Sequence, residues 1–308
     1  MPPRILVVTG PTASGKTAAA LELCLHLGGE LVSADSMQIY RGMDVGTAKS
    51  SPEERRGVPH HMIDLLDPDQ PFSVADYATA ARSALRDILD RGRVPVVCGG
   101  TGQYVSALVE ELVFHASPRD EVVRERLQAE ADTVGGAAML ERLRCIDPEA
   151  AGRLHPNDRR RILRALEVFE TTGRTFTEMN LLSHPEVRAF DFRTYVLHPD
   201  KEVLYRRCDL RVEQMMEKGL LREVEGLLAK GVSPNAQSMQ AIGYKELAAF
   251  LDGKGTLSDS IERIQQATRN YAKRQLTWFR GWKDASWIDV DTGEESGIPG
   301  RIQSDFTM

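Results

Sequence analysis

The segment GPTASGKT, residues 10–17, constrains the possible folds more than any other part of the chain. It matches the phosphate-binding loop pattern G-x-x-x-x-G-K-[ST] at every fixed position. The apolar, β-branched run RILVVT before it predicts a buried parallel strand. A helical pattern follows from Thr17 to Leu27 and ends at two glycines, residues 28 and 29. Because strand, glycine loop and helix are the setting that this motif requires, we predict that the chain binds a di- or triphosphate.

The residue types in the loop explain how it would hold phosphate. Gly10 and Gly15 let the backbone curl so that its N–H groups point at an anion. The N-terminus of the following helix adds a partial positive charge. Lys16 can reach the terminal phosphate, and Thr17 can offer its hydroxyl to Mg²⁺ as a direct metal ligand. The predicted phosphate-binding residues of the loop are Gly10, Thr12, Ala13, Ser14, Gly15, Lys16 and Thr17.

Composition excludes several classes of protein. The 308 residues suffice for one large domain or for a core with an insertion. No run of about 18 apolar residues occurs and the N-terminus leads directly into the first strand, so we expect neither a membrane span nor a signal peptide. Four cysteines without a C-x-x-C pair predict buried thiols in the cytoplasm, not disulfides or a zinc site. A net charge of −6 argues against a general polyanion binder but allows one basic face. We also expect a monomer.

The order of the predicted elements indicates an α/β fold. A second strand at residues 30–34 is followed by a long irregular stretch, a capped helix at 73–91 and a third strand at 94–98. This β-α-β-α-β order is typical of a doubly wound parallel sheet. From about Ser117 only helices are predicted, until a strand returns at 192–197.

We therefore predict a sheet of the P-loop type with an all-helical insertion domain. Residues 1–115 and 190–308 would form the core with its C-terminal helices, and residues 116–189 would form the insertion. Within the core, one helix is predicted over residues 237–251. The tail from Lys283, rich in glycine, proline and acids, is predicted to be loosely ordered.

Two polar residues follow predicted strands at the edge of the sheet where ligands bind. Asp35 could bind Mg²⁺ through water or act as a general base, but it could also be only an N-cap or turn residue. Thr101, after two glycines, could hold a phosphate oxygen or belong to a simple strand-to-helix turn. The residues alone leave these alternatives open.

Basic residues form two strips on predicted helices. Their outward faces suggest contact with a phosphate backbone, whereas the alternative is a solvated surface on which the first strip pairs with Glu167 and Glu170. Arg207 and Arg211, four residues apart on another helix, could clamp a diphosphate. The first strip comprises Arg159, Arg160, Arg161 and Arg164, and the second comprises Arg269, Lys273, Arg274 and Arg280.

Several longer strings carry a resemblance to a known family. GPTASGKT, SADSMQIY at residues 33–40, GMDVGTAK at 42–49 and KRQLTWFR at 273–280 closely resemble the bacterial tRNA dimethylallyltransferases, also called tRNA isopentenyltransferases. The resemblance runs from the N-terminus to about Trp282. It implies transfer of a dimethylallyl group from dimethylallyl diphosphate to the exocyclic amine of the adenosine just 3′ of the anticodon, tRNA position 37, with release of diphosphate. The implied partners are the tRNA anticodon arm and dimethylallyl diphosphate, with Mg²⁺ as cofactor.

The resemblance also implies roles for single residues. Asp35 would contact the target adenine as general base, Thr101 would lie at the reacting centre, and Arg211 would bind the diphosphate. The chain departs from the family pattern at Gln103, where an apolar residue is usual, and in the spacing to Arg124, which is one residue longer. The implied tRNA-contacting residues are Asp35, Ser36, Met37, Gln38, Arg124, Arg160, Arg161, Arg164, Gln240, Gly243, Lys245, Lys273, Arg274 and Arg280.

Two other functions share the phosphate loop. A small-molecule P-loop kinase would use ATP and a small acceptor. A nucleotide-gated RNA-binding protein would perform no transfer, but the sequence lacks an obvious apolar strand that ends in a Walker-type Asp near a water-positioning Gln. The family strings and the basic strips favour prenyl transfer, and binding of ATP remains a separate possibility.

Overall fold

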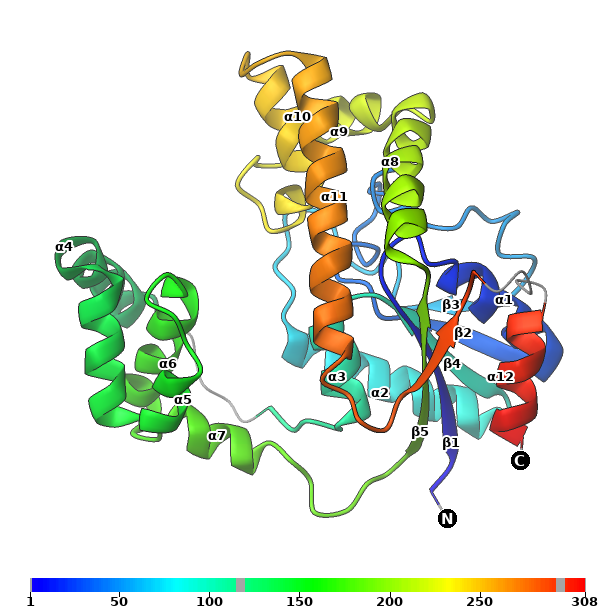
Figure 1. Ribbon diagram of the computed structural model, residues 1–308, viewed down its shortest axis with the longest axis horizontal. Helices are drawn as coiled ribbons and strands as arrows, with labels where there is room; N and C mark the ends of the chain where they lie inside the picture. The colour runs from blue at the N-terminus through cyan, green and yellow to red at the C-terminus, as the bar shows by residue number, and fades with distance from the viewer. Residues whose placement is uncertain (1, 115–119, 292–296, 308) are drawn as a thin grey trace. The chain divides into compact units, whose positions relative to one another are not determined.

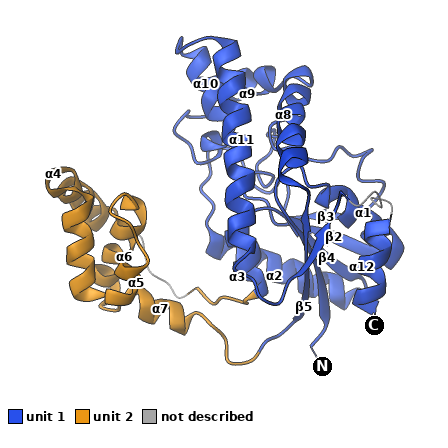
Figure 2. Ribbon diagram, viewed as in Figure 1, with its two compact units in different colours: residues 1–109, 188–308 blue, residues 110–187 orange. Residues whose placement is uncertain are grey.

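The computed structural model describes residues 2–114, 120–291 and 297–307 (Figure 1). It divides into two compact units, which Figure 2 shows in separate colours. The first unit comprises residues 1–109 and 188–308, and the second comprises residues 110–187. The second unit overlaps the helical insertion that the sequence predicts at 116–189.

The first unit is built on a six-stranded parallel sheet with the strand order β3-β2-β4-β1-β5-β6. Thr9 pairs with Gly99 and Ser33 with Cys98, so the carboxyl ends of three central strands meet at one edge. The predicted doubly wound P-loop-type sheet is confirmed. The strands are β1 (Arg4–Thr9), β2 (Gly29–Ser33), β3 (His60–His61), β4 (Val94–Gly99), β5 (Asp191–His198) and β6 (Ser286–Asp289).

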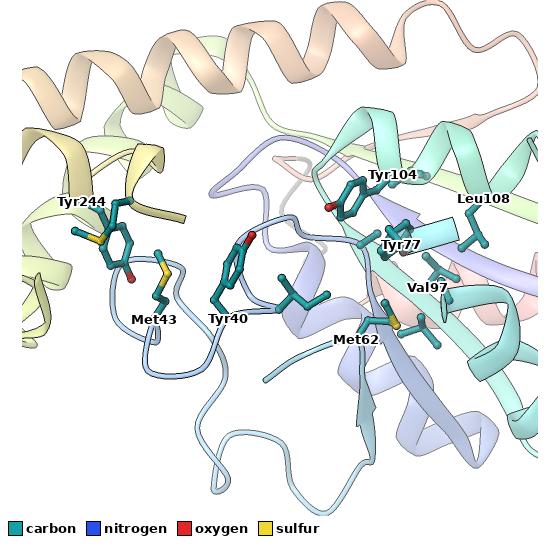
Figure 3. Close-up of a cluster of buried hydrophobic side chains, with 14 of the residues drawn as sticks. Tyr40, Met43, Met62, Tyr77, Val97, Tyr104, Leu108 and Tyr244 are labelled. Atoms are coloured by element: carbon teal, nitrogen blue, oxygen red, sulfur yellow. The ribbon is translucent and has the colours of Figure 1, made fainter. Parts of the chain in front are cut away.

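Helices bury both faces of this sheet, because successive strand residues point to opposite sides. Val7 and Val97 lie in one core with Tyr77 and Tyr104, whose stacked rings are 4.0 Å apart; Figure 3 shows part of this core. Leu6, Val8 and Val96 lie in the opposite core. The helices of this unit are α1 (Lys16–Leu27), α2 (Val74–Asp90), α3 (Gly102–Val109), α8 (Lys201–Glu217), α9 (Leu220–Ala229), α10 (Tyr244–Leu251), α11 (Leu257–Phe279) and α12 (Ile298–Thr307).

The helix predicted over residues 237–251 is interrupted. A short 3₁₀ helix, η1 (Ser238–Gln240), is separated from α10 by Gly243, which has φ of +95°. A positive φ is incompatible with a continuous helix and is favoured by glycine. The prediction of one continuous helix was wrong at this point.

The C-terminal tail is ordered where the structure describes it, so the prediction of a loose tail was wrong. β6 pairs with β5, and Ile298, Ile302 and Phe306 of α12 are buried in the same core as α1. Ile288 and Val290 are also buried there, although glycine, proline and acidic residues surround this apolar pattern in the sequence. Residues 292–296 lie outside the described part.

In the described part of the second unit, residues 110–114 and 120–187, four helices surround a separate core. Leu127, Leu140, Leu143, Ile162 and Leu166 are buried together. These residues recur at helical spacing, which is why each helix buries one face. The helices are α4 (Glu121–Ile146), α5 (Pro148–Gly152), α6 (Arg159–Thr172) and α7 (Phe176–Leu182).

Three of the four cysteines are buried as predicted, but Cys145 on α4 is exposed, so the prediction was wrong for that thiol. Across the described ranges, no helix is long and apolar enough to cross a membrane.

The packing of α12 makes a testable prediction about stability. Ile302 is fully buried, so Ile302→Ala should lower the free energy of unfolding by about 2–5 kcal/mol through lost burial and a cavity. Ser304→Ala, at an exposed position of the same helix, is the control. Urea denaturation measures both variants. Equal stability of the two would contradict the packed position of the tail.

Candidate active site

The phosphate loop between β1 and α1 has the backbone conformation that an anion cradle requires. Gly10, Ala13 and Gly15 have φ of +151°, +63° and +83°. A Cβ atom at Gly10 would lie 2.4 Å from the backbone oxygen of Leu197 on β5, so only glycine fits there. Gly15 is the N-cap residue of α1 and has no side chain to occupy the N–H groups of the first turn. These donors are therefore available to a phosphate group.

Two cations approach this loop. Lys16 donates from Nζ to the backbone oxygen of Pro11 at 3.1 Å. Burial lowers the pKa of Lys16, and the nearby positive charge of Arg211 lowers it further. The nearby groups of Cys98 and Asp35 act on that pKa in the opposite direction. Burial also lowers the pKa of Arg211. Since both charges are costly to bury, an anion between them would stabilise the site.

Asp35 and Thr101 tie together the segments that follow β2 and β4. Asp35 Oδ1 accepts from the N–H of Met37 at 2.9 Å and of Gln38 at 3.4 Å. Thr101 Oγ1 accepts from the N–H of Ser36 at 3.0 Å, and the N–H of Thr101 donates to the oxygen of Ala34 at 3.2 Å. Asp35 is thus a turn residue, and its side chain also lines the cavity next to the loop. Both bonds of the turn end on Oδ1, so Oδ2 is the oxygen that can act on a ligand.

That cavity has a volume of about 350 Å³ and belongs to the first unit. It gathers residues that are far apart in the sequence, from the phosphate loop to α11. The predicted site residues that line it are Thr12, Lys16, Thr17, Asp35, Ser36, Met37, Gln38, Arg211, Gln240, Gly243, Lys245 and Arg274.

Other predicted residues lie outside the cavity wall. Lys273 and Arg280 are exposed at α11, and Thr101 touches the site through Ser36. Arg124, Arg160 and Arg161 are exposed on helices of the second unit.

The first arginine strip differs from its predicted form. Arg159 pairs with Asp132, and Arg164 pairs with Glu167 at 3.2 Å. Arg160 and Arg161 are exposed, whereas Arg159 and Arg164 are half-buried. The four arginines therefore do not form one open surface, because Asp132 of α4 and Glu167 of α6 itself pair with two of them. The pair of Arg164 with Glu167 is the one that the alternative of a solvated surface predicted.

Glu170 is the other acid that the alternative of a solvated surface paired with the first strip, and its partners differ from that expectation. Glu170 binds Arg126 and Arg142 of α4, the latter at 2.6 Å, instead of an arginine of the first strip. Arg269 of the second strip pairs with Asp209. Arg207 pairs with Asp291 at 3.6 Å, while Arg211 of the suggested clamp faces the cavity.

Sequence reasoning missed Gln275, which bridges two loops of the site. Its Oε1 accepts from the N–H of Thr12 at 2.8 Å, and its Nε2 donates to the oxygen of Gly100 at 2.7 Å. Gln275 is buried on the apolar face of α11, seven residues after Thr268. A glutamine at a buried helical position requires polar partners, and this signal could have identified it.

Tyr271, one turn before Gln275, also lines the cavity and was missed. Burial and then the nearby charge of Asp35 raise the pKa of Tyr271 to about 12, so its hydroxyl stays protonated at neutral pH. It can serve as a donor to a bound ligand.

Comparison with known proteins places this geometry in a family. The family model described as IPP transferase matches residues 38–282, and that described as isopentenyl transferase matches residues 3–67. A tRNA dimethylallyltransferase of Geobacillus thermodenitrificans (strain NG80-2) is 43% identical over 298 residues, covering 97% of this chain and 94% of the relative.

Solved structures agree with this assignment. The full-length tRNA isopentenylpyrophosphate transferase of Bacillus halodurans is 40% identical, with a TM-score of 0.73 and coverage of 99% of this chain and 97% of that one. A eukaryotic dimethylallyltransferase solved acting on tRNA is 29% identical, with a TM-score of 0.81 and coverage of 99% and 79%. The chain therefore belongs to the IPP transferase family, which includes the tRNA dimethylallyltransferases.

Proposed function

We propose that this enzyme transfers a dimethylallyl group from dimethylallyl diphosphate to the exocyclic amine of adenosine 37 of tRNA and releases diphosphate. Membership of the IPP transferase family supports a prenyl donor and a tRNA acceptor. The observation that carries the proposal is a single cavity lined by Lys16, Arg211 and Asp35. The first two suit a leaving diphosphate, and the third suits the attacking amine.

The cations would act on the leaving group. As the allylic carbon–oxygen bond breaks, negative charge grows on the diphosphate. The N–H groups at the start of α1, Lys16 and Arg211 would stabilise that charge more strongly than the charge of the bound donor, which is the requirement for catalysis. Ser14 Oγ, which is buried and has no hydrogen-bond partner among the described residues, is a further group that an anion would satisfy.

Asp35 would act on the acceptor. An adenine amine is a poor nucleophile, and its nitrogen becomes acidic as the bond to the prenyl carbon forms. A carboxylate in hydrogen-bond reach can orient the amine and accept the proton. The base must first leave the stack of the anticodon loop to enter the cavity, and this costs least in a single-stranded loop.

The protein side chains of this site could bind Mg²⁺ only if oxygens of the bound diphosphate supplied further ligands. Among the described residues, no group of three His, Cys, Asp or Glu side chains is placed to hold a metal ion. Thr17 is exposed and lines the cavity, so its hydroxyl could supply one ligand while diphosphate oxygens and water supply the others. Bound in this way, Mg²⁺ would add positive charge beside the departing diphosphate.

A small-molecule kinase is the alternative with the same loop, and family membership supports prenyl transfer over it. Purified enzyme should form prenylated adenosine in tRNA from dimethylallyl diphosphate, measured by mass spectrometry of the tRNA nucleosides. Consumption of ATP with a free nucleoside, and no prenylated product, would instead establish the kinase.

We expect Lys16→Ala to damage mainly the use of the donor. Loss of a point charge next to a developing anion should lower kcat by about 10²- to 10³-fold. Binding of tRNA should persist, because the exposed basic residues remain. The control is Lys230→Ala on the exposed surface. Wild-type turnover of Lys16→Ala at saturating donor would show that the loop is a structural turn.

We expect Asp35→Asn to slow the chemical step by about 10²- to 10⁴-fold while both substrates still bind. Asparagine keeps an oxygen that can accept from the N–H groups of Met37 and Gln38, so the turn is preserved and only the base is lost. Single-turnover rates at several Mg²⁺ concentrations are the measurement. Recovery of the rate by added Mg²⁺ would assign Asp35 to the metal, and an unchanged rate would remove it from the mechanism.

We expect the exposed basic residues to bind the tRNA backbone. Alanine at Arg160, Arg161 and Lys273 together should weaken tRNA binding, and each lost phosphate contact should lower the slope of log K against log salt by roughly 0.7 to 0.9. The affinity for the donor should not change. An unaltered tRNA affinity and salt slope would disprove a role for these three side chains.

A further inference from the structure

One wall of the candidate cavity is held by a carboxylate from a distant helix. The N–H groups of Asp44 and Val45 both donate to Glu223 Oε2 at 2.8 Å, and that of Gly46 donates to Oε1 at 3.1 Å. Glu223 lies on α9, 177 positions after Gly46. Three successive N–H groups around one carboxylate form the arrangement that backbone nests use to bind an anion. We call residues 44–46 with Glu223 the carboxylate clamp.

Tyr244 completes the carboxylate clamp from the other side. Its hydroxyl donates to Glu223 Oε1, and burial and then the charge of Glu223 raise its pKa, so it remains a donor. Its ring packs on Gly46, where a Cβ atom would come within 2.4 Å of the ring. Figure 3 shows Tyr244 beside the segment that carries Met43. The turn is thus held by bonds and by close packing together.

The residue after the turn connects the carboxylate clamp to the reaction site. The backbone oxygen of Thr47 accepts from Gln38 Nε2 at 3.2 Å and from Arg211 Nη2 at 3.5 Å. Thr47 itself is buried, and its hydroxyl donates to the oxygen of Met43 at 2.6 Å. Any movement of the turn therefore moves the acceptor that two cavity-lining side chains share.

Lys49 fixes the far end of the same segment. Its Nζ donates to Asp44 Oδ1 at 2.7 Å, to Asp64 Oδ1 at 2.6 Å and to the oxygen of Tyr40 at 2.8 Å. The lysine side chain is 4% exposed, whereas the carboxylates of Asp44 and Asp64 reach the surface. Lys49 only donates, so it does not satisfy the N–H groups of residues 44–46, which donate to Glu223.

We propose that Glu223 is a positioning residue for prenyl transfer. By binding the turn at 44–46, it places the Thr47 oxygen, which directs Arg211 toward the diphosphate and Gln38 toward the base. The inference rests on the proposed function of the cavity. Glu223 acts through the turn and does not itself contact the diphosphate or the adenine.

The substitution Glu223→Gln tests the need for the second carboxylate oxygen, because it replaces that oxygen with an NH₂ group. Glutamine has the same size but offers one oxygen and one NH₂ group. If its oxygen accepts from Asp44 and Val45, its NH₂ group faces the N–H of Gly46, and two donors then oppose each other. The Tyr244 hydroxyl can turn to accept, so the mismatch falls on the turn. Glu225→Gln, at an exposed position of α9, is the matched control.

Hydrogen exchange and kinetics on the full chain test the proposal together. In Glu223→Gln, amide exchange over residues 44–46 should accelerate, and the affinity for the donor should fall. The single-turnover rate at saturating substrates should drop by about 10- to 10²-fold, as expected for a small misplacement of a catalytic group. The affinity for tRNA should fall less than the affinity for the donor, because the exposed basic contacts are intact and only Gln38 is displaced. Glu225→Gln should match the wild type in every measurement.

A wild-type transfer rate and donor affinity in Glu223→Gln would overturn the proposal, even if the melting temperature fell. Should that variant not fold, Glu223→Asp keeps the charge on a shorter side chain, and faster exchange at 44–46 without slower transfer would overturn it equally. Failure of the wild type to prenylate tRNA would reject the proposed function instead. In that case binding of inorganic diphosphate decides, since weaker binding by Glu223→Gln supports the role of Glu223 and equal binding contradicts it.

Discussion

The parallel pairing of β1, β2 and β4 is the constraint on which the rest of the site depends. It brings the phosphate loop, Asp35 and Thr101 to one edge of the sheet, although they are separated by tens of residues in the chain. The approach is close, since a Cβ atom at Gly99 would lie 2.2 Å from the oxygen of Ala34. Glycine there allows Thr101 to bond to Ala34 and Ser36, and so fixes the end of β4 against the turn that carries Asp35.

The C-terminal half of the chain supplies the other residues that line or hold the cavity. Gln275 of α11 bonds to both the phosphate loop and the segment after β4, and Arg211 of α8 faces the same cavity. Glu223 of α9 holds the turn that forms another wall. The cavity thus acquires cations, an acid and hydrogen-bond donors from elements that are far apart in sequence. Under the proposed function, this convergence is what would hold a diphosphate and a nucleobase next to each other.

The sequence revealed what depends on local patterns and missed what depends on single long-range contacts. The phosphate loop was predictable because strand, glycines and helix follow one another, and Asp35 because it directly follows a strand. No motif identified Gln275 or Glu223, because each is an ordinary polar residue whose importance comes from hydrogen-bond partners more than 170 positions away. The pairing of Arg159 with Asp132, 27 positions earlier on α4, was likewise marked by no motif. The tail was misjudged because β6 pairs with β5 and the few apolar residues of α12 pack beside α1, and both partners lie far away in the sequence.

The central claim is that one cavity holds the leaving diphosphate and the attacking amine together. The most direct measurement is the structure of this enzyme with a tRNA anticodon arm and a non-reactive thio analogue of dimethylallyl diphosphate. The account predicts the diphosphate on the N–H groups of the phosphate loop with Lys16 and Arg211, and the adenine amine in hydrogen-bond reach of Asp35. A diphosphate bound away from the loop, or an adenine amine out of reach of Asp35, would contradict it.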